Sequence, residues 1–279
     1  MVAIGQRNSL RVIRETASGL YLDGESLGQI LLPGRYIPKG CELGSSLSVF
    51  VYRDSEDRLV ATTETPRAMV GDFASLKVVS VSAQMGAFLD WGLSKDLLLP
   101  IREQAHRVMR GQFVVAHVLL DTKTGRLFAS THLNRFLDLS EPPFTEGQAV
   151  QLLIVGETPL GYKAIVDNTH WGLLYHSDLS VPLDIGRRLS GYVRLIRPGG
   201  KIDLALNPAG YQRVGALTEQ IMDALKANHG ELEFDDQSSP EAIRAAFGTS
   251  KKAFKQALGA LFRDRQIAFE KPGIRLLSE

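Results

Sequence analysis

Aromatic residues recur along this chain at spacings that suit the binding of unpaired nucleic acid bases. Phe50, His117 and Tyr192 stand 67 and then 75 residues apart, and Tyr21 and Phe88 share the first of these spacings. A flat ring can stack on an unpaired base, which contributes roughly 1–3 kcal/mol per base. Cations near the rings can pair with the phosphates. The pattern therefore predicts a surface for unpaired nucleic acid bases.

The same spacings separate three sets of landmark residues, so the chain contains an internal repeat. The sets are Gly19, Gly86 and Gly161; Pro33, Pro100 and Tyr175; and Gly44, Gly111 and Gly186. Agreement among separate sets without a gap indicates three copies of one structural unit. After about Pro208 the pattern changes, which predicts a different final domain.

Each repeat contains five short segments with strand composition, bounded by turn residues such as Asp23-Gly24. The predicted strands are 10–16, 20–22, 29–32, 47–52 and 59–62; 76–82, 87–89, 97–99, 113–120 and 126–130; and 150–155, 162–166, 172–175, 189–196 and 201–206. Five strands with the longest link between the third and fourth favour a five-stranded OB-fold barrel, which has no exposed edges. A small SH3-like barrel is the alternative.

Rings and cations are expected to share one face of these barrels. The rings expected to face nucleic acid bases are Tyr21, Phe88, Tyr162, Tyr175, Phe50, His117 and Tyr192. Arg58, Arg126 and Lys201 each begin a fifth strand, close enough to pair with phosphate. The alternative is that the rings belong to the core and the cations to solvated turns. Trp91 and Trp171 are interpreted as packing residues.

The final domain reads as helix, helix-turn-helix and hairpin. Leu217, Ile221 and Leu225 recur at helical spacing, and Ser239-Pro240 is an N-cap followed by a first-turn proline. This order predicts a winged helix, whose third helix commonly enters a nucleic acid groove. Its expected contacts are Lys251, Lys252 and Lys255 on that helix, and Lys271 and Arg275 on the wing. A solvated lysine face is the alternative.

Composition bounds the class of protein. Hydrophobic residues make up 44% and charged residues 23%, which is ordinary for a folded domain. The net charge of +1 gives no strong overall field, but 250–275 is basic and 215–241 is acidic. The single Cys41 cannot form an internal disulfide. No apolar run approaches the roughly 20 residues of a membrane span, and the start lacks a signal peptide core, so a cytoplasmic protein without a membrane partner is expected.

No catalytic motif is expected to act in this chain. His176-Ser177-Asp178 has the residue types of a nucleophilic triad, but sequence neighbours do not assemble one, because a triad is defined by its spatial geometry. A Gly-Lys-Ser/Thr phosphate loop and a His-Glu-x-x-His zinc motif are both missing from the sequence. The sequence predicts no enzyme, no cofactor, no metal site and no small-molecule substrate.

The second repeat resembles the RNA-binding OB domain named after ribosomal protein S1, through residues 85–90, 97–100 and 121–127. The third repeat resembles it through 172–177. Three such repeats followed by a winged helix resemble the conserved virulence factor B family of bacterial RNA-binding regulators. The resemblance implies three S1-like barrels at 1–66, 67–141 and 142–213, and a winged-helix domain at 214–279.

Three functions fit this organisation. The first is a non-catalytic regulator that grips single-stranded RNA and acts in post-transcriptional control. The second is an adaptor that binds the translation machinery, such as the ribosome, or the transcription machinery, and the acidic Asp235 and Asp236 favour it. The third is a DNA-binding regulator that uses the winged helix. Competition between duplex DNA and single-stranded RNA would separate the first from the third.

Overall fold

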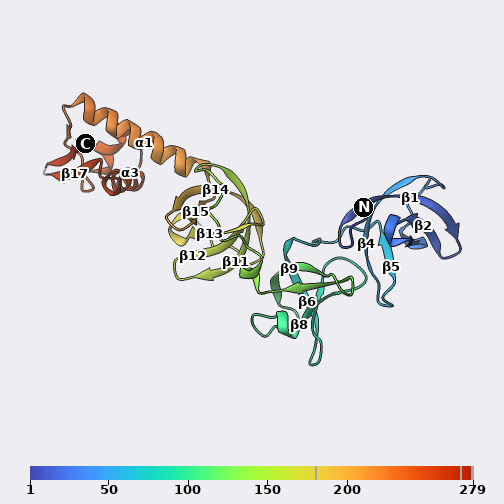
Figure 1. Ribbon diagram of the computed structural model, residues 1–279. Coiled ribbons are helices and arrows are strands. Elements are labelled where there is room, and N and C mark those ends of the chain that lie inside the picture. Colours follow the sequence, from blue (N-terminus) through green and yellow to red (C-terminus); the bar gives the residue numbers. More distant parts are fainter. Residues whose placement is uncertain (180, 271, 278–279) are drawn as a thin grey trace. The chain divides into compact units, whose positions relative to one another are not determined.

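The computed structural model describes residues 1–179, 181–270 and 272–277, with the side chains of 208–216, 252 and 263 excepted. Within these residues the chain forms three closed five-stranded barrels, then three helices and a three-stranded sheet. Figure 1 follows the barrels from blue to yellow and the final domain in orange and red. The predicted fold class, tandem OB-type barrels followed by a winged helix, is confirmed.

The first barrel consists of β1 (Arg7–Thr16), β2 (Gly19–Asp23), β3 (Gln29–Pro33), β4 (Ser46–Arg53) and β5 (Leu59–Thr62). Their order is β1-β2-β3-β5-β4, and β4 returns to pair with β1. The β3–β5 pair is parallel and the other pairs are antiparallel. Closure leaves no unpaired edge that another chain could extend.

The second and third barrels repeat this arrangement. The second holds β6 (Phe73–Ser82), β7 (Gly86–Asp90), β8 (Leu97–Pro100), β9 (Phe113–Asp121) and β10 (Arg126–Ser130). The third holds β11 (Ala149–Thr158), β12 (Gly161–Val166), β13 (His170–Tyr175), β14 (Arg188–Arg197) and β15 (Lys201–Ala205). The 3-10 turns are η1 (Glu25–Leu27), η2 (Gly34–Tyr36), η3 (Ile101–Glu103), η4 (Leu133–Arg135) and η5 (His176–Asp178).

The landmark glycines of the repeat have a steric cause. Gly19, Gly86 and Gly161 begin the second strand of each barrel and pair with Pro33, Pro100 and Tyr175, the second set of landmarks. An added Cβ at these glycines would lie 2.1, 2.2 and 1.9 Å from the carbonyl oxygens of Leu32, Leu99 and Leu174. Only glycine fits so close an approach of two strands.

The third set of landmark glycines lies just before the fourth strand of each barrel. Gly44, Gly111 and Gly186 have φ of 88°, 86° and 87°. Their N–H groups donate to the carbonyl oxygens of Val12, Val78 and Ile154 on the first strand of the same barrel. Glycine tolerates a positive φ best, so the need for this backbone conformation explains why glycine recurs at these three positions.

The C-terminal domain has α1 (Pro208–Ala227), β16 (Glu231–Leu232), α2 (Pro240–Phe247), α3 (Lys251–Arg263), β17 (Ile267–Glu270) and β18 (Gly273–Leu276). The side chains of Ser239 and Ser250 accept bonds from Ala242 N and Ala253 N, which caps α2 and α3. The sheet order is β16-β18-β17. The sequence did not predict β16, because two residues carry no periodicity.

The chain divides into two compact units. One holds 1–142, 151–190 and 198–201, and the other holds 143–150, 191–197 and 202–279. In the first unit, Phe50 and Tyr52 of β4 share a core with Trp91 of the second barrel. The ring centroids of Phe50 and Trp91 lie 5.6 Å apart in a T-shaped contact. The first two barrels are therefore joined by buried aromatic packing.

A second apolar cluster joins the second and third barrels within the same unit. It contains Phe73, Val115, Leu133, Leu137, Leu153 and Ile165, with Phe136, Val155 and Trp171 packed against it. Asp138 N also donates to Thr169 O at 2.8 Å. Within the described residues, no helix is both long and apolar enough to cross a membrane.

Candidate nucleic-acid interface

The outward face of the second and third strands is the surface that OB-folds commonly use for oligonucleotides. In each barrel the inward residues of these strands are buried, as Leu20 and Leu22 are in β2 and Ala87 and Leu89 are in β7. The outward residues between them are only partly covered. Side-chain alternation along a strand therefore places Tyr21 and Phe88 on the outer face.

The first barrel carries a ring beneath a cation. Tyr21 is half-buried and pairs across the strands with Arg14, whose guanidinium carbon lies 4.2 Å from the ring centroid. Arg14 is exposed, and it also donates to Gln29 Oε1 at 3.0 Å. The sequence interpretation missed Arg14, because its place beside Tyr21 follows from the register between β1 and β2, which residue spacing alone does not give. The pair presents a flat ring and a positive charge together.

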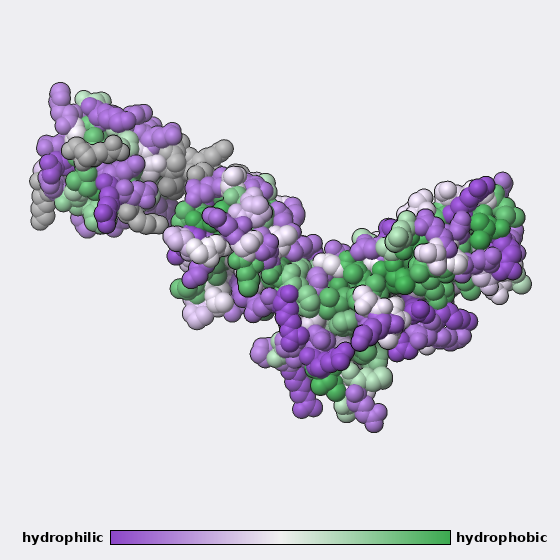
Figure 2. Space-filling model, in the orientation of Figure 1, coloured by the Kyte–Doolittle hydropathy of each residue, from purple (hydrophilic) through white to green (hydrophobic). Residues whose placement is uncertain are grey.

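The second barrel carries a ring without such a pair. Phe88 is half-buried and lies opposite Leu98 and Ser80. Hydrophobic side chains remain on the surface of this barrel, and Val81, Met85, Ile101, Met109 and Phe113 are 50% to 71% exposed. Figure 2 shows hydrophobic residues among hydrophilic ones on its visible face. Phe113, which pairs with the exposed Lys77, is a second ring that the sequence interpretation missed.

The third barrel has its ring and cation at different positions. Lys163 occupies the position that Tyr21 and Phe88 hold elsewhere, and its ammonium lies 3.6 Å from the centroid of the Trp171 ring. Burial lowers the pKa of Lys163. Tyr175 is half-buried and shares the outward face of β13 with Trp171. Three residues of this barrel thus combine two rings with one cation.

Two of the three predicted fourth-strand rings are covered and not available to RNA, which corrects those two contacts. Phe50 is fully buried against Trp91. His117 is 8% exposed and stacks on Phe136 of the linker, with the ring centroids 4.4 Å apart. Burial lowers the pKa of His117. The shared register therefore marks the surfaces where one barrel packs against the next part of the chain.

Two further rings differ from each other. Tyr162 is 4% exposed, because it is an inward residue of β12, and it meets His176 edge to face at 5.3 Å. Its predicted role in stacking on bases is therefore wrong, and the outward position beside it belongs to Lys163. Tyr192 is half-buried on β14.

The fifth-strand cations are less free than expected. Arg58 is bonded to Asp54 at 2.7 Å and to Glu56 at 2.9 Å. Arg126 is bonded to Asp57 of the first barrel at 2.6 Å, and this hydrogen bond holds the pKa of Asp57 below its usual value. Arg126 therefore bridges the first and second barrels through an exposed ion pair, and its contact with phosphate stays a prediction that has to compete with Asp57. Lys201 is exposed.

The winged-helix cations are engaged by acids and carbonyls of their own domain. Lys255 lies 3.3 Å from Asp236, and Arg275 lies 2.9 Å from Glu270. Lys251 donates to the carbonyl oxygen of Gln237 at 3.2 Å. Such exposed pairs are weak and can exchange partners. Lys252 has no described side chain, and Lys271 lies outside the described residues.

The triad-like residues do not form a triad. His176 Nε2 lies 3.1 Å from the carbonyl oxygen of Thr158 and 3.6 Å from Glu157. Ser177 Oγ is 3.5 Å from Asp178. Within the described part of the chain, no three His, Cys, Asp or Glu side chains are grouped so that they could hold a metal ion.

Two family models match the ends of this chain. The S1 domain matches residues 4–64, and the CvfB-like winged helix domain matches residues 219–276. The two matches cover the first barrel and most of the C-terminal domain.

Curated relatives match most of its length. YitL, an uncharacterized protein of Bacillus subtilis, is 29% identical over 94% of this chain and 90% of its own. Conserved virulence factor B of Staphylococcus haemolyticus is 27% identical over 98% of this chain and 94% of its own. A solved multidomain protein with nucleic acid binding domains from Streptococcus pneumoniae is 21% identical, covers 98% of both chains and has a TM-score of 0.42.

Proposed function

Because this chain belongs to the conserved virulence factor B family, we propose that it is a non-catalytic RNA-binding regulator in post-transcriptional control. The outward faces of its barrels grip single-stranded RNA. Bases stack on Tyr21, Phe88 and Tyr175, and phosphates pair with nearby cations. With a net charge of only +1, stacking rather than charge supplies most of the affinity.

The observation that carries this proposal is the pairing of rings with cations on partly exposed barrel faces. Arg14 lies over Tyr21, and Lys163 lies over Trp171. A core ring would be sealed, whereas Tyr21 and Trp171 keep part of their surface in solvent. Base stacking is tolerant of sequence, so single-stranded RNA of mixed composition is the expected ligand.

Binding of a labelled 12-nucleotide RNA, measured by fluorescence anisotropy, tests the proposal. Phe88→Ala is expected to weaken binding roughly 5- to 150-fold, the equivalent of 1–3 kcal/mol per lost stack. Val81→Ala, at an exposed site on the same barrel, is the matched control. Circular dichroism confirms the fold of both variants. Equal affinities for Phe88→Ala, Tyr175→Ala and Val81→Ala would refute RNA binding by this face.

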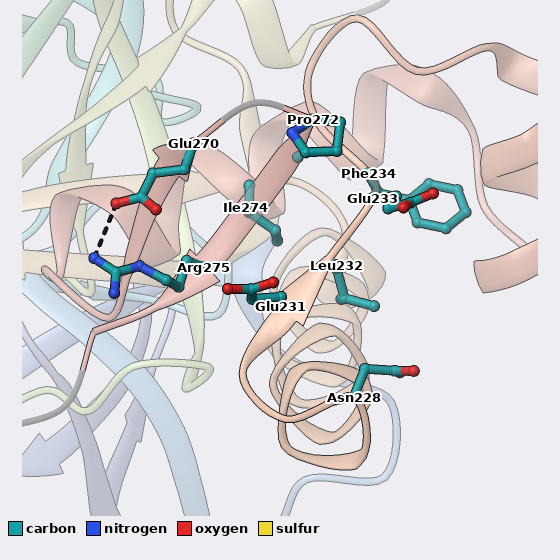
Figure 3. A pocket seen from close by; sticks show the side chains of 10 residues that line it. Asn228, Glu231, Leu232, Glu233, Phe234, Glu270, Pro272, Ile274 and Arg275 are labelled. Carbon is teal, nitrogen blue, oxygen red and sulfur yellow. Dashed lines mark hydrogen bonds and ion pairs between the residues drawn. The ribbon is translucent and has the colours of Figure 1, made fainter.

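A specific observation favours a protein partner for the C-terminal domain. A hollow of about 570 Å3 beside the wing is lined by Glu231, Glu233 and Glu270, together with Phe234 and Arg275. Figure 3 shows the ion pair of Arg275 with Glu270 at this hollow. Carboxylates repel phosphate, so this side of the domain suits a basic protein segment better than nucleic acid. Partner capture that survives nuclease treatment and is lost in Glu231→Lys would support this adaptor role.

A further inference from the structure

A hollow of about 410 Å3 lies where the second and third barrels adjoin, within one compact unit of the chain. Its walls are Ala105 and residues 131–135 from the second barrel and the following linker, and Trp171 from the third barrel. Its volume falls in the range of roughly 300–1,000 Å3 that is common for small-ligand sites. We propose that this hollow binds one nucleotide of the RNA, with the base against Trp171. The inference rests on the proposed RNA-binding function and adds a defined site to it.

Trp171 is held in place as a platform. Its Nε1 donates to Asn134 Oδ1 at 2.9 Å, and the ring packs against the apolar cluster between the barrels. The ammonium of Lys163 covers one face of the ring. Lys163 does not line the hollow, whereas Trp171 and its hydrogen-bond partner Asn134 both do. A fixed, half-buried indole loses little conformational entropy when a base stacks on it.

The polar groups of the hollow match the other parts of a nucleotide. Asn134 uses its oxygen on Trp171, which leaves its amide N–H groups to donate to acceptors on a base edge. Arg135 is exposed and lies 3.7 Å from Glu103, a long contact that leaves its guanidinium able to reach a phosphate. The ring of His132 adds a third polar group. The indole ring and the amide would contact the base, and the guanidinium would contact its phosphate.

Hydrogen bonds fix Ala105 and Thr131 of the wall to each other and to the loop after η3. Ala105 N donates to Thr131 Oγ1 at 2.8 Å, and Thr131 N donates to the carbonyl oxygen of Glu103 at 2.9 Å. These bonds tie the loop after η3 to the end of the second barrel. The hollow is therefore formed before any ligand arrives, as small-ligand sites usually are. The side chain of Ala105 is exposed at its edge and offers a place to fill it.

Two variants test the site by filling it or leaving it open. Ala105→Leu places extra side-chain volume in the hollow, whereas Ala227→Leu adds the same side chain at an exposed position at the end of α1. A labelled 12-nucleotide oligo(A) is the probe. Ala105→Leu is expected to weaken its binding roughly 5- to 150-fold, the loss of one stacked base, and Ala227→Leu is expected to leave it unchanged.

Tryptophan fluorescence gives a second readout. The chain has two tryptophans, so Trp91→Phe makes Trp171 the sole emitter. Its emission is expected to be quenched saturably by oligo(A), and less so when Ala105→Leu is added. Comparing the wild-type protein with Trp171→Phe isolates the same signal if Trp91→Phe weakens the barrel contact.

The outcomes separate this site from the general function. If RNA binds and depends on Phe88, but Ala105→Leu behaves as Ala227→Leu does, the site is refuted and RNA binding stands. Unchanged Trp171 emission at saturating oligo(A) would refute the site in the same way. If no variant or wild-type protein binds oligo(A) or oligo(U), both proposals fail.

Discussion

The ammonium nitrogen of Lys163 lies 3.6 Å from the centroid of the Trp171 ring on the outward face of the third barrel. Arg14 and Tyr21 make the corresponding contact in the first barrel, at 4.2 Å. The cation comes from β12 in one case and from β1 in the other. The two barrels therefore reach the same combination of ring and charge through different strand positions.

Salt dependence should distinguish Arg14 from Arg126. Each phosphate contact contributes about 0.7 to the slope of log K against log salt for a single strand. Arg14→Gln is expected to lower the slope by about this amount, because its guanidinium lies on the outward face. Arg126→Gln should leave the slope unchanged, since Asp57 holds Arg126 in a barrel contact. Anisotropy titrations at four salt concentrations measure both, and equal changes would contradict the assignment.

Phe50→Ala should destabilise the protein without acting on RNA directly. Removing a buried phenylalanine costs roughly 3–5 kcal/mol, and this ring is fully buried against Trp91. Tyr21→Ala, on the outer face, should cost much less stability but more RNA affinity. Urea unfolding and anisotropy, run on both variants, give the two quantities. A Phe50→Ala protein that stays stable but fails to bind RNA would show that Phe50 acts in RNA binding and not in the core.

His117 should make the stability depend on pH. Burial lowers its pKa in the folded protein, so the ring stays neutral there while the unfolded chain takes up a proton below about pH 6.5. Stability should therefore fall as pH drops from about 7 towards 5, and His117→Phe should reduce that fall. The measurement is the difference in Tm between pH 7.5 and 5.5 for the two proteins. An equal difference in both would exclude His117 as a source.

Gly86→Ala should disturb the second barrel more than a glycine change in open space. The new Cβ would meet the carbonyl oxygen of Leu99 at 2.2 Å, so two strands must separate, at a cost of roughly 1–3 kcal/mol. Gly156→Ala is the control, because no atom lies within 4 Å of its added Cβ. Thermal unfolding followed by circular dichroism compares them. Equal Tm values would show that the repeated glycine has another cause.

The strands could be predicted because local chemistry defines them. Glycines where the second and third strands approach closely recur for a steric reason. The tight turn predicted at Asp23-Gly24 is wrong, because Gly24 has a φ of −89° and precedes the 3-10 turn η1. The short β16 could not be predicted, since its pairing with β18 depends on a distant segment. The division into four domains at 1–66, 67–141, 142–213 and 214–279 stays a prediction.

The site was harder to predict than the fold, because an outward ring looks the same in sequence whether it faces solvent or a neighbouring barrel. Phe50 and His117 are outward on their own strands but covered by the next part of the chain. Arg126 forms an ion pair with Asp57, which lies 69 residues away in sequence. Trp171 was interpreted as packing, and it does pack, yet it also lines a hollow. Binding by Tyr21, Phe88 and Tyr175 stays a prediction.

Because fourth-strand residues pack against the following part of the chain, single barrels cannot be excised without exposing apolar surface. A fragment of 67–141 alone would leave Trp91 without Phe50 and Tyr52, and would remove Leu153 and Ile165 from the cluster around Phe73. Both newly exposed surfaces are apolar, so such a fragment should self-associate or aggregate. RNA-binding measurements on isolated barrels would then be confounded by these exposed apolar surfaces. Point substitutions in the full chain are the better way to assign RNA binding to individual repeats.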